Sequence, residues 1–171
     1  MKGVILDNRT TCRGPNYSPN LKPIFKELNG FHKKLNWLIT NYECFSPDED
    51  NEKYVELLKG DGKPIWVTGE ELDEIIMTDE ELYWIWGVLS AFKKDVSKED
   101  VLKYEEPWAD GYTGFWQNPI SIQHPSAEVE IVPWDSSLVL LISKEEEIIN
   151  EFRKHYPLAK DLEKYNVETF N

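Results

Sequence analysis

The feature that most constrains this chain is a run of ten residues, 83–92, that contains no charged side chain and is rich in large apolar ones. Apolar side chains occupy both alternate sets of positions in this run, which is typical of a strand that is buried on both faces. The spacing of Ile85, Trp86, Leu89 and Phe92 also fits one face of a helix, so the pattern leaves both structures open. Ten residues are about half of what a membrane-spanning helix needs, so we expect a buried element of the core and no membrane span.

The rest of the chain mixes strand patterns and helix patterns without a regular alternation. Strand patterns lie at residues 2–7, 35–44, 129–132 and 138–142, and a Gly-Asp-Gly turn at 60–62 predicts a hairpin between 54–58 and 64–67. Helix patterns lie at 20–30, 68–76, 97–102, 143–156 and 158–165, with capping residues expected at Thr68, Ser97 and Ser143. We therefore predict an α+β fold, a mostly antiparallel sheet with helices packed on one face, in a single domain over residues 1–171.

The net charge of −13 is concentrated in one part of the chain. Residues 45–82 carry thirteen acidic and three basic side chains, a net of −10. A chain this acidic lacks the cations that displace counterions from a phosphate backbone, so we expect no nucleic-acid partner. Clustered charge speeds the encounter with an oppositely charged protein, so Asp48, Glu49, Asp50 and Glu52 are candidates for a surface that meets a basic protein partner. The alternative is a solvated acidic face that keeps the protein soluble.

The sequence contains no motif that defines an enzyme or a cofactor site. It has no glycine-rich phosphate loop, no Gly-x-Ser-x-Gly turn and no closely spaced pair of histidines or cysteines. We therefore expect no cofactor and no metal, and we assign no catalytic residue. The two cysteines, Cys12 and Cys44, are expected to be free thiols in a reducing cytoplasm. The apolar run at the N-terminus ends after three residues, so we expect no signal peptide and a cytoplasmic location.

The stretch 106–136 is the best sequence candidate for a ligand site, because it sets aromatic rings among amides, carboxylates and a histidine. Rings stack on the apolar faces of a glycan or peptide while polar side chains fix its orientation. The ligand-binding candidates are Trp108, Asp110, Tyr112, Trp116, Gln123, His124, Trp134 and Asp135. An enzyme centred on Asp110, His124 and Asp135 is one form of this hypothesis. The alternative is that a loop of about twenty residues uses its aromatic side chains to pack against the body of the domain.

Several short segments carry a resemblance to a protein family. They are Lys2-Gly3-Val4-Ile5, Leu21-Lys22-Pro23-Ile24, Trp37-Leu38-Ile39, Gly69-Glu70-Glu71-Leu72, and residues 134–138 and 143–149. These segments resemble an uncharacterised family of small acidic bacterial proteins of unknown function. The resemblance implies an α+β fold with residues 83–92 as a central strand, and it brings no catalytic residues. The aromatic stretch 108–124 departs from the pattern of that family. In composition, the chain also resembles bacterial immunity proteins, which are compact, acidic, rich in tryptophan and cytoplasmic.

These patterns favour a non-enzymatic binding protein, of which an immunity-type inhibitor of a basic toxin domain is the most specific form. The alternative is a protein or enzyme that binds a small ligand or a glycan through residues 108–135, and self-association is a third hypothesis. The first two differ in their response to salt, because exposed charges are screened within about 8 Å at physiological salt whereas stacked rings are not.

Overall fold

The structure is a computed structural model, and it describes residues 1–7, 19–46, 57–58, 62–78 and 81–170. Within these residues the chain forms one antiparallel sheet of seven strands in the order β3-β2-β4-β5-β6-β1-β7. The strands are β1 (Lys2–Asp7), β2 (Leu35–Phe45), β3 (Ile65–Thr68), β4 (Tyr83–Lys93), β5 (Val129–Trp134), β6 (Leu138–Ser143) and β7 (Lys160–Asp161). The apolar run 83–92 therefore lies in strand β4, which pairs with β2 on one side and with the central strand β5 on the other.

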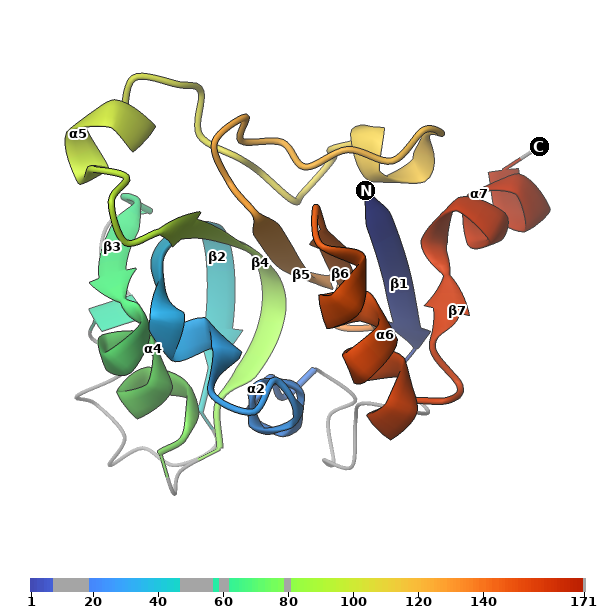
Figure 1. The fold of residues 1–171 in the computed structure, drawn as a ribbon, viewed down its shortest axis with the longest axis horizontal. Coiled ribbons are helices and arrows are strands. Elements are labelled where there is room, and N and C mark those ends of the chain that lie inside the picture. The colour runs from blue at the N-terminus through green and yellow to red at the C-terminus, as the bar shows by residue number, and fades with distance from the viewer. Residues whose placement is uncertain (8–18, 47–56, 59–61, 79–80, 171) are drawn as a thin grey trace.

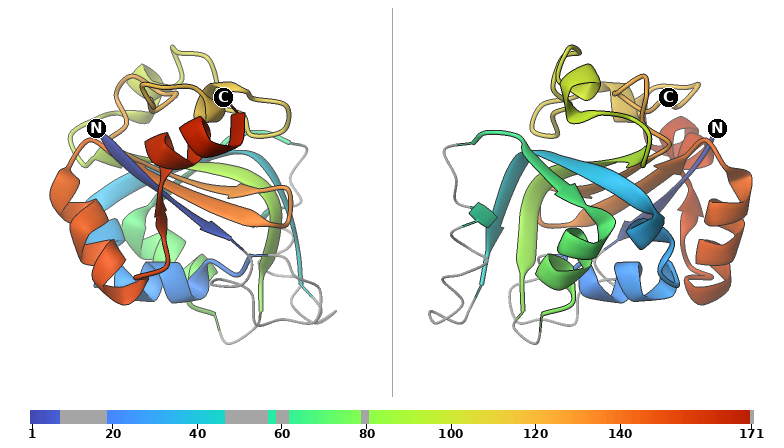
Figure 2. Two further views of the ribbon diagram at one scale, coloured as in Figure 1. Left: turned by 90° about the vertical axis from the view of Figure 1, so that its right-hand side faces the viewer. Right: turned by 60° about the vertical axis from the view of Figure 1, so that its left-hand side comes forward.

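Helices and a long connecting segment cover the two faces of this sheet. The helical elements are α2 (Lys22–Glu27), α4 (Gly69–Ile76), α5 (Lys98–Val101), α6 (Glu146–His155) and α7 (Leu162–Phe170), with the short 3-10 turns η1 (Phe31–Lys34) and η2 (Gly114–Trp116). Figure 1 shows α2, α4 and α6 on one face and the segment 102–128 on the other, and Figure 2 shows these layers from two more sides. The predicted α+β fold with an antiparallel sheet is confirmed, and α7 joins the second face by burying Leu162 there.

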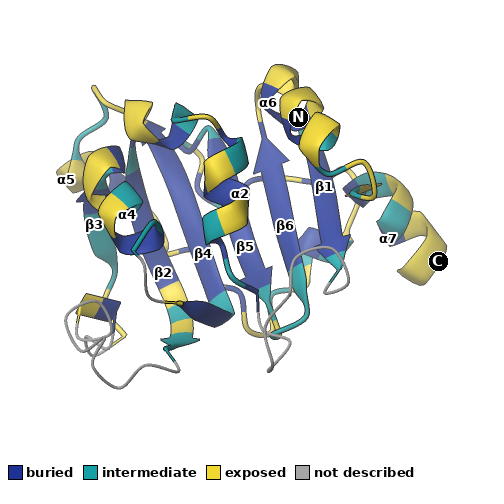
Figure 3. Cartoon of the chain, turned by 90° about the horizontal axis from the view of Figure 1, so that it is seen from below, coloured by how far each residue is buried: buried dark blue, intermediate teal, exposed yellow. Residues whose placement is uncertain are grey.

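Side chains that alternate along the strands separate into two apolar clusters, one for each face of the sheet. The cluster under the helices includes Val4, Leu6, Trp37, Ile39, Leu89, Ile131 and Leu141 of the strands, with Ile24, Phe25, Leu72, Ile75, Ile149 and Phe152 of the helices. The opposite cluster includes Ile5, Leu38, Val88, Val132, Leu140 and Ile142 of the strands, with Ala109, Phe115, Ile120, Ile122 and Ala127 of the segment 102–128. Because both faces are covered, the central strands are buried along their length (Figure 3), and β4 needs no polar face.

Helix α4 begins with the capping box that the sequence predicts. Thr68 Oγ1 accepts a hydrogen bond from the backbone N–H of Glu71 at 3.2 Å, and the Glu71 carboxylate accepts one from the N–H of Thr68 at 2.7 Å. The next residue is Gly69, where a Cβ atom would lie 2.1 Å from the carbonyl oxygen of His32. A glycine at this position therefore lets α4 approach η1 closely, and this contact fixes the position of η1 on the sheet.

Two predicted helix starts are wrong. Ser143 is the last residue of β6 and caps no helix, and α6 begins at Glu146 without a side-chain cap. The Ser143 hydroxyl instead accepts a hydrogen bond from the N–H of Glu145 at 3.0 Å. The last helix begins at Leu162, later than predicted, because Lys160–Asp161 first pair with β1 as strand β7.

The predicted hairpin between 54–58 and 64–67 is also wrong in the part that the structure describes. Strand β3 pairs with β2, and residues 57–58 are helical, whereas 54–56 and 60–61 lie outside the described residues. An apolar strand such as β3 can pair with the edge strand β2, which is distant in the sequence. A local turn signal does not reveal such a pairing. Among the helices that the structure describes, none is both long and apolar enough to span a bilayer.

Candidate functional site

The aromatic loop, which we define as residues 102–128, is held to the sheet by an asparagine in a strand irregularity. The pairing of β2 with β4 shifts register between Thr40 and Glu43, and Asn41 there has a φ of 43°. The Asn41 side-chain oxygen accepts hydrogen bonds from the N–H groups of Ala109 at 2.6 Å and Asp110 at 2.9 Å. The irregularity in β2 thus serves to hold the first half of the aromatic loop.

A buried carboxylate on the central strand holds the second half of the loop. Glu130 is completely buried and accepts hydrogen bonds from the N–H of Gln123 at 3.0 Å, from the N–H of His124 at 3.2 Å and from the hydroxyl of Ser90 at 3.2 Å. Burial raises the pKa of Glu130 to about 7, although these hydrogen bonds lower it. The burial of Tyr112 itself, followed by the charge of Glu130, raises the pKa of Tyr112. Glu130 therefore lies within the core, and its carboxylate holds the aromatic loop to the sheet.

His124 uses both of its ring nitrogens within the protein. The ring is 1% exposed, Nδ1 accepts a hydrogen bond from the N–H of Ser126 at 3.2 Å, and Nε2 lies 3.1 Å from the carbonyl oxygen of Val101. The carbonyl can only accept, so the proton of the neutral ring is on Nε2. Burial lowers the pKa of His124, and the edges of Phe92 and Tyr104 pack against the ring. His124 therefore has no free nitrogen for a substrate in this structure.

The aromatic side chains of the predicted ligand site form a continuous series of ring contacts. Trp108 meets Tyr112, Tyr112 meets Phe115, and Phe115 meets Trp134, with centroid distances of 5.0, 4.8 and 5.8 Å and near-perpendicular planes. Trp116 also meets Trp134 edge to face at 5.1 Å. Each ring thus presents its face or edge to another ring of the protein, and Trp108, at 42% exposed, is the most accessible of the four predicted rings.

The polar members of the predicted ligand site do not converge on one point. The Gln123 side chain forms two hydrogen bonds with the backbone of Trp108, at 3.1 and 2.9 Å, so its amide is already used. Asp110 and Asp135 are exposed, and Asp135 has a φ of 46° in the turn between β5 and β6. No hydrogen bond or ion pair joins Asp110, His124 and Asp135, all of which the structure describes. The predicted partner surface, Asp48, Glu49, Asp50 and Glu52, lies outside the described residues.

A groove on the helical face is a further candidate site that the sequence did not indicate. It has a volume of about 560 Å³ and lies between α2 with η1 on one side and α6 on the other, and Figure 3 shows these helices side by side. We call it the α2–α6 groove. Its lining residues are Lys26, Glu27, Leu28, Asn29, Phe31, Lys34, Glu145, Glu147, Ile148, Glu151, Phe152 and His155.

The α2–α6 groove has an apolar floor and walls of opposite charge. The floor is formed by side chains of the helical-face cluster, Leu28, Phe31, Ile148 and Phe152. One wall carries Lys26 and Lys34, and the facing wall on α6 carries Glu145, Glu147 and Glu151. Glu151 forms an ion pair with Lys154. Within the described residues, the two lysines and the other two glutamates have no ion pair, so their charges are available to a ligand.

The two ends of the groove differ. At the C-terminal end of α6, His155 Nδ1 lies 2.6 Å from Glu27 Oε2, and this contact joins the two walls. At the other end, the strand register places one residue of each wall. Lys34 directly precedes the first residue of β2, and Glu145 follows the last residue of β6 by two positions. The pairing of β2 with β4, of β4 with β5 and of β5 with β6 places these two strand ends at the same end of the sheet. Lys34 and Glu145 therefore lie at the same end of the groove.

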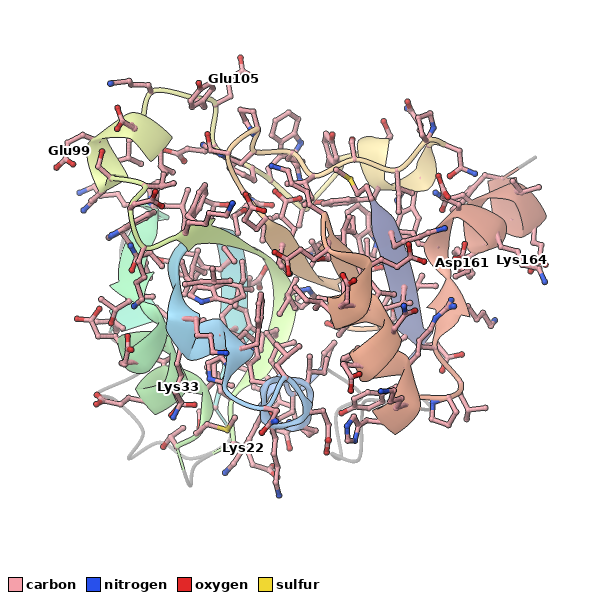
Figure 4. The ribbon with its side chains drawn as sticks, in the orientation of Figure 1. Lys22, Lys33, Glu99, Glu105, Asp161 and Lys164 are labelled. Carbon is pink, nitrogen blue, oxygen red and sulfur yellow. The ribbon has the colours of Figure 1, made fainter. Side chains whose placement is uncertain are left out.

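The position of the lysine wall is fixed by a polar cluster between η1 and α4. His32 is buried, its Nε2 lies 2.8 Å from Asp73 Oδ1, and Lys33 Nζ lies 2.7 Å from the other oxygen of Asp73. Burial alone would raise the pKa of Asp73, but the hydrogen bonds from Lys33 and His32 outweigh it and lower the pKa. Figure 4 shows Lys33 beside α4, from which Asp73 comes. This cluster ties η1, and with it Phe31 and Lys34, to helix α4.

Two further features bear on the chemistry of the molecule. Cys44 is a free thiol, and burial followed by the charge of Glu43 raises its pKa to about 12, so it holds little of the nucleophilic thiolate at neutral pH. Cys12 lies outside the described residues. In the part of the chain that the structure describes, no three His, Cys, Asp or Glu side chains are grouped so that they could hold a metal ion.

Comparisons with protein-family models, with curated proteins and with solved structures found no match to this chain. The function is therefore argued from the geometry of the molecule.

Proposed function

We propose that this chain is a binding protein and that the α2–α6 groove is its contact site for a protein partner. The observation that carries the proposal is one groove of about 560 Å³ with a buried apolar floor and unpaired charges on its walls. An apolar floor supplies binding energy by burial, and charged walls around it orient what binds.

The partner that we propose is basic, as in an immunity-type inhibitor of a basic toxin domain. The net charge of −13 supports this choice, because it attracts a cationic protein over distances comparable to the Debye length, about 8 Å at physiological salt. The acidic residues 48–52 remain part of the same prediction, as a surface that adds to the attraction.

A small-ligand or glycan site on the aromatic loop is the alternative proposal. The observation in its favour is Trp108, whose ring is 42% exposed beside that of Tyr112. The internal hydrogen bonds of Gln123 and His124 count against it, because a ligand would have to break them to use these side chains. The groove is favoured because four of its charged side chains have no ion pair within the described residues, namely Lys26, Lys34, Glu145 and Glu147.

The proposal is tested with a photo-crosslinking amino acid placed in the groove. A benzoylphenylalanine at position 31 replaces Phe31 at the half-buried floor, and the matched control carries it at Tyr104, which is 51% exposed on the opposite face. In lysate of the native organism, we expect one protein to crosslink at position 31 and not at position 104, and the same protein to be lost when Glu147→Lys is added. Equal crosslinking at both positions, or none at position 31, would contradict the proposal.

A further inference from the structure

We infer that the occupant of the α2–α6 groove is a segment of the partner protein, about 15 Å long, that carries apolar side chains together with one basic and one acidic side chain. This inference rests on the proposed function and specifies the chemistry of the segment that the groove accepts. It follows from the length of the groove and the arrangement of its charges.

The length of the groove sets the length of the segment that it accepts. Helix α6 forms one wall along its ten residues, so the groove is about 15 Å long, the span of four or five extended residues.

The charges of the walls favour a segment that carries both signs. Lys26 and Lys34 lie on one wall, and Glu145 and Glu147 lie on the other, all without an ion pair within the described residues. A purely basic segment would bring cations beside both lysines, and a purely acidic one would bring anions beside both glutamates. A segment with one cation and one anion can pair with both walls. The two walls together therefore disfavour segments whose charges are all of one sign.

The closed end and the floor complete the description of the occupant. Glu27 and His155 already contact each other at that end, so no charge is needed from the segment there. The floor is formed by Leu28, Ile148 and Phe152, each less than 10% exposed, with Phe31 beside them. Aliphatic side chains of the segment would cover this floor, while its two charged residues extend to the walls at the open end.

The test uses blocked pentapeptides with Leu at the second and fourth positions. Two mixed peptides have Asp at one end and Lys at the other, in both orders, and two controls have Lys at both ends or Asp at both ends. Dissociation constants are measured at low salt from NMR shifts of the groove amides. We expect the better mixed peptide to bind about fivefold more tightly than either control, the ratio that about 1 kcal/mol for one exposed ion pair gives. Equal binding of the mixed and the two-lysine peptides would overturn the inference.

Charge reversal in the wall provides a second, matched measurement. Lys34→Glu should transfer the preference to the two-lysine peptide, and Lys34→Glu with Glu147→Lys should restore the preference for a mixed peptide. Lys98→Glu, the same change on exposed α5, should leave the order of affinities unchanged. An unchanged preference in Lys34→Glu would contradict the inference.

The remaining outcomes separate the inference from the proposed function. If the peptides shift groove amides without a preference for mixed charge, the inference fails and the groove remains a contact site. If no peptide shifts the groove amides at millimolar concentration, the inference fails, and the crosslinking experiment alone decides the proposed function. If the groove amides shift with the concentration of the protein itself, the occupant is a second copy, and the inference is overturned.

Discussion

Replacement of Glu130 by Gln should change how the stability of this protein depends on pH. Glu130 is completely buried, and burial raises its pKa from 4.5 to about 7. A carboxyl group whose pKa is raised by folding stabilises the folded state while it holds its proton. Its contribution is therefore full below the unfolded pKa and is lost as the pH rises through the folded pKa. Between about pH 5.5 and about pH 8 the wild type should lose about 2 kcal/mol from this group, at about 1.4 kcal/mol per pKa unit.

The Glu130→Gln variant has no proton to lose at this position. Its amide nitrogen cannot accept a hydrogen bond, so it leaves one N–H of the loop unpaired, at a cost of about 1–3 kcal/mol at every pH. The stability advantage of the wild type over the variant should therefore be about 2 kcal/mol larger at pH 5.5 than at pH 8. Urea unfolding, followed by tryptophan fluorescence at both pH values, measures this difference.

A matched control removes a carboxylate from the surface of the same loop. Glu105 is exposed near α5, as Figure 4 shows, and Glu105→Gln disturbs no buried hydrogen bond. The stability difference between this control and the wild type should therefore stay the same at both pH values. If the difference for Glu130→Gln is also the same at pH 5.5 and pH 8, then Glu130 does not hold its proton in the folded state and the reasoning is refuted.

Three further substitutions test the packing of the fold. Ile149→Ala should cost about 2–5 kcal/mol in urea melts, because Ile149 is 3% exposed under α6, and a wild-type midpoint would mean that α6 buries another face. Gly69→Ala should cost at least about 1–3 kcal/mol in thermal melts, because its Cβ would overlap the backbone of η1, and an unchanged melting temperature would exclude this contact. Asn41→Ala should speed hydrogen exchange at Ala109 and Asp110, and Asn41→Asp, which keeps the acceptor oxygen, should not.

The sequence predicted those elements whose signals are local. The capping box of Thr68 and Glu71 forms α4, and the strands at 2–7 and 138–142 lie where their apolar runs predict. The run 83–92 was ambiguous, because an element that is buried on both faces has no polar side to define its period. The prediction of a helix cap at Ser143 was wrong because this residue is the last of β6. Its pairing with β1 and β5 there determines its backbone conformation.

The candidate site was less predictable than the fold, because it depends on contacts between distant segments. Glu147 and Glu151 are four residues apart, as are Ile148 and Phe152, and this spacing indicates an amphipathic helix. It does not indicate that α2 will lie beside that helix and place lysines opposite the glutamates. Likewise, the sequence left open whether His124 binds a ligand or the backbone, and the partners of its two nitrogens come from residues 101 and 126.

In the proposed binding of a basic partner, the net charge of the protein and the charges of the groove walls act at different stages. An excess of thirteen negative charges raises the rate at which a basic protein is encountered, and salt weakens that attraction. Once a segment lies in the α2–α6 groove, its apolar side chains exclude water from the floor, so the wall charges act on it at short range. Salt should therefore change mainly the association rate, and Lys34→Glu mainly the dissociation rate. An acidic protein with lysines in its groove can in this way attract many cationic proteins and retain those that present an acidic residue beside a basic one.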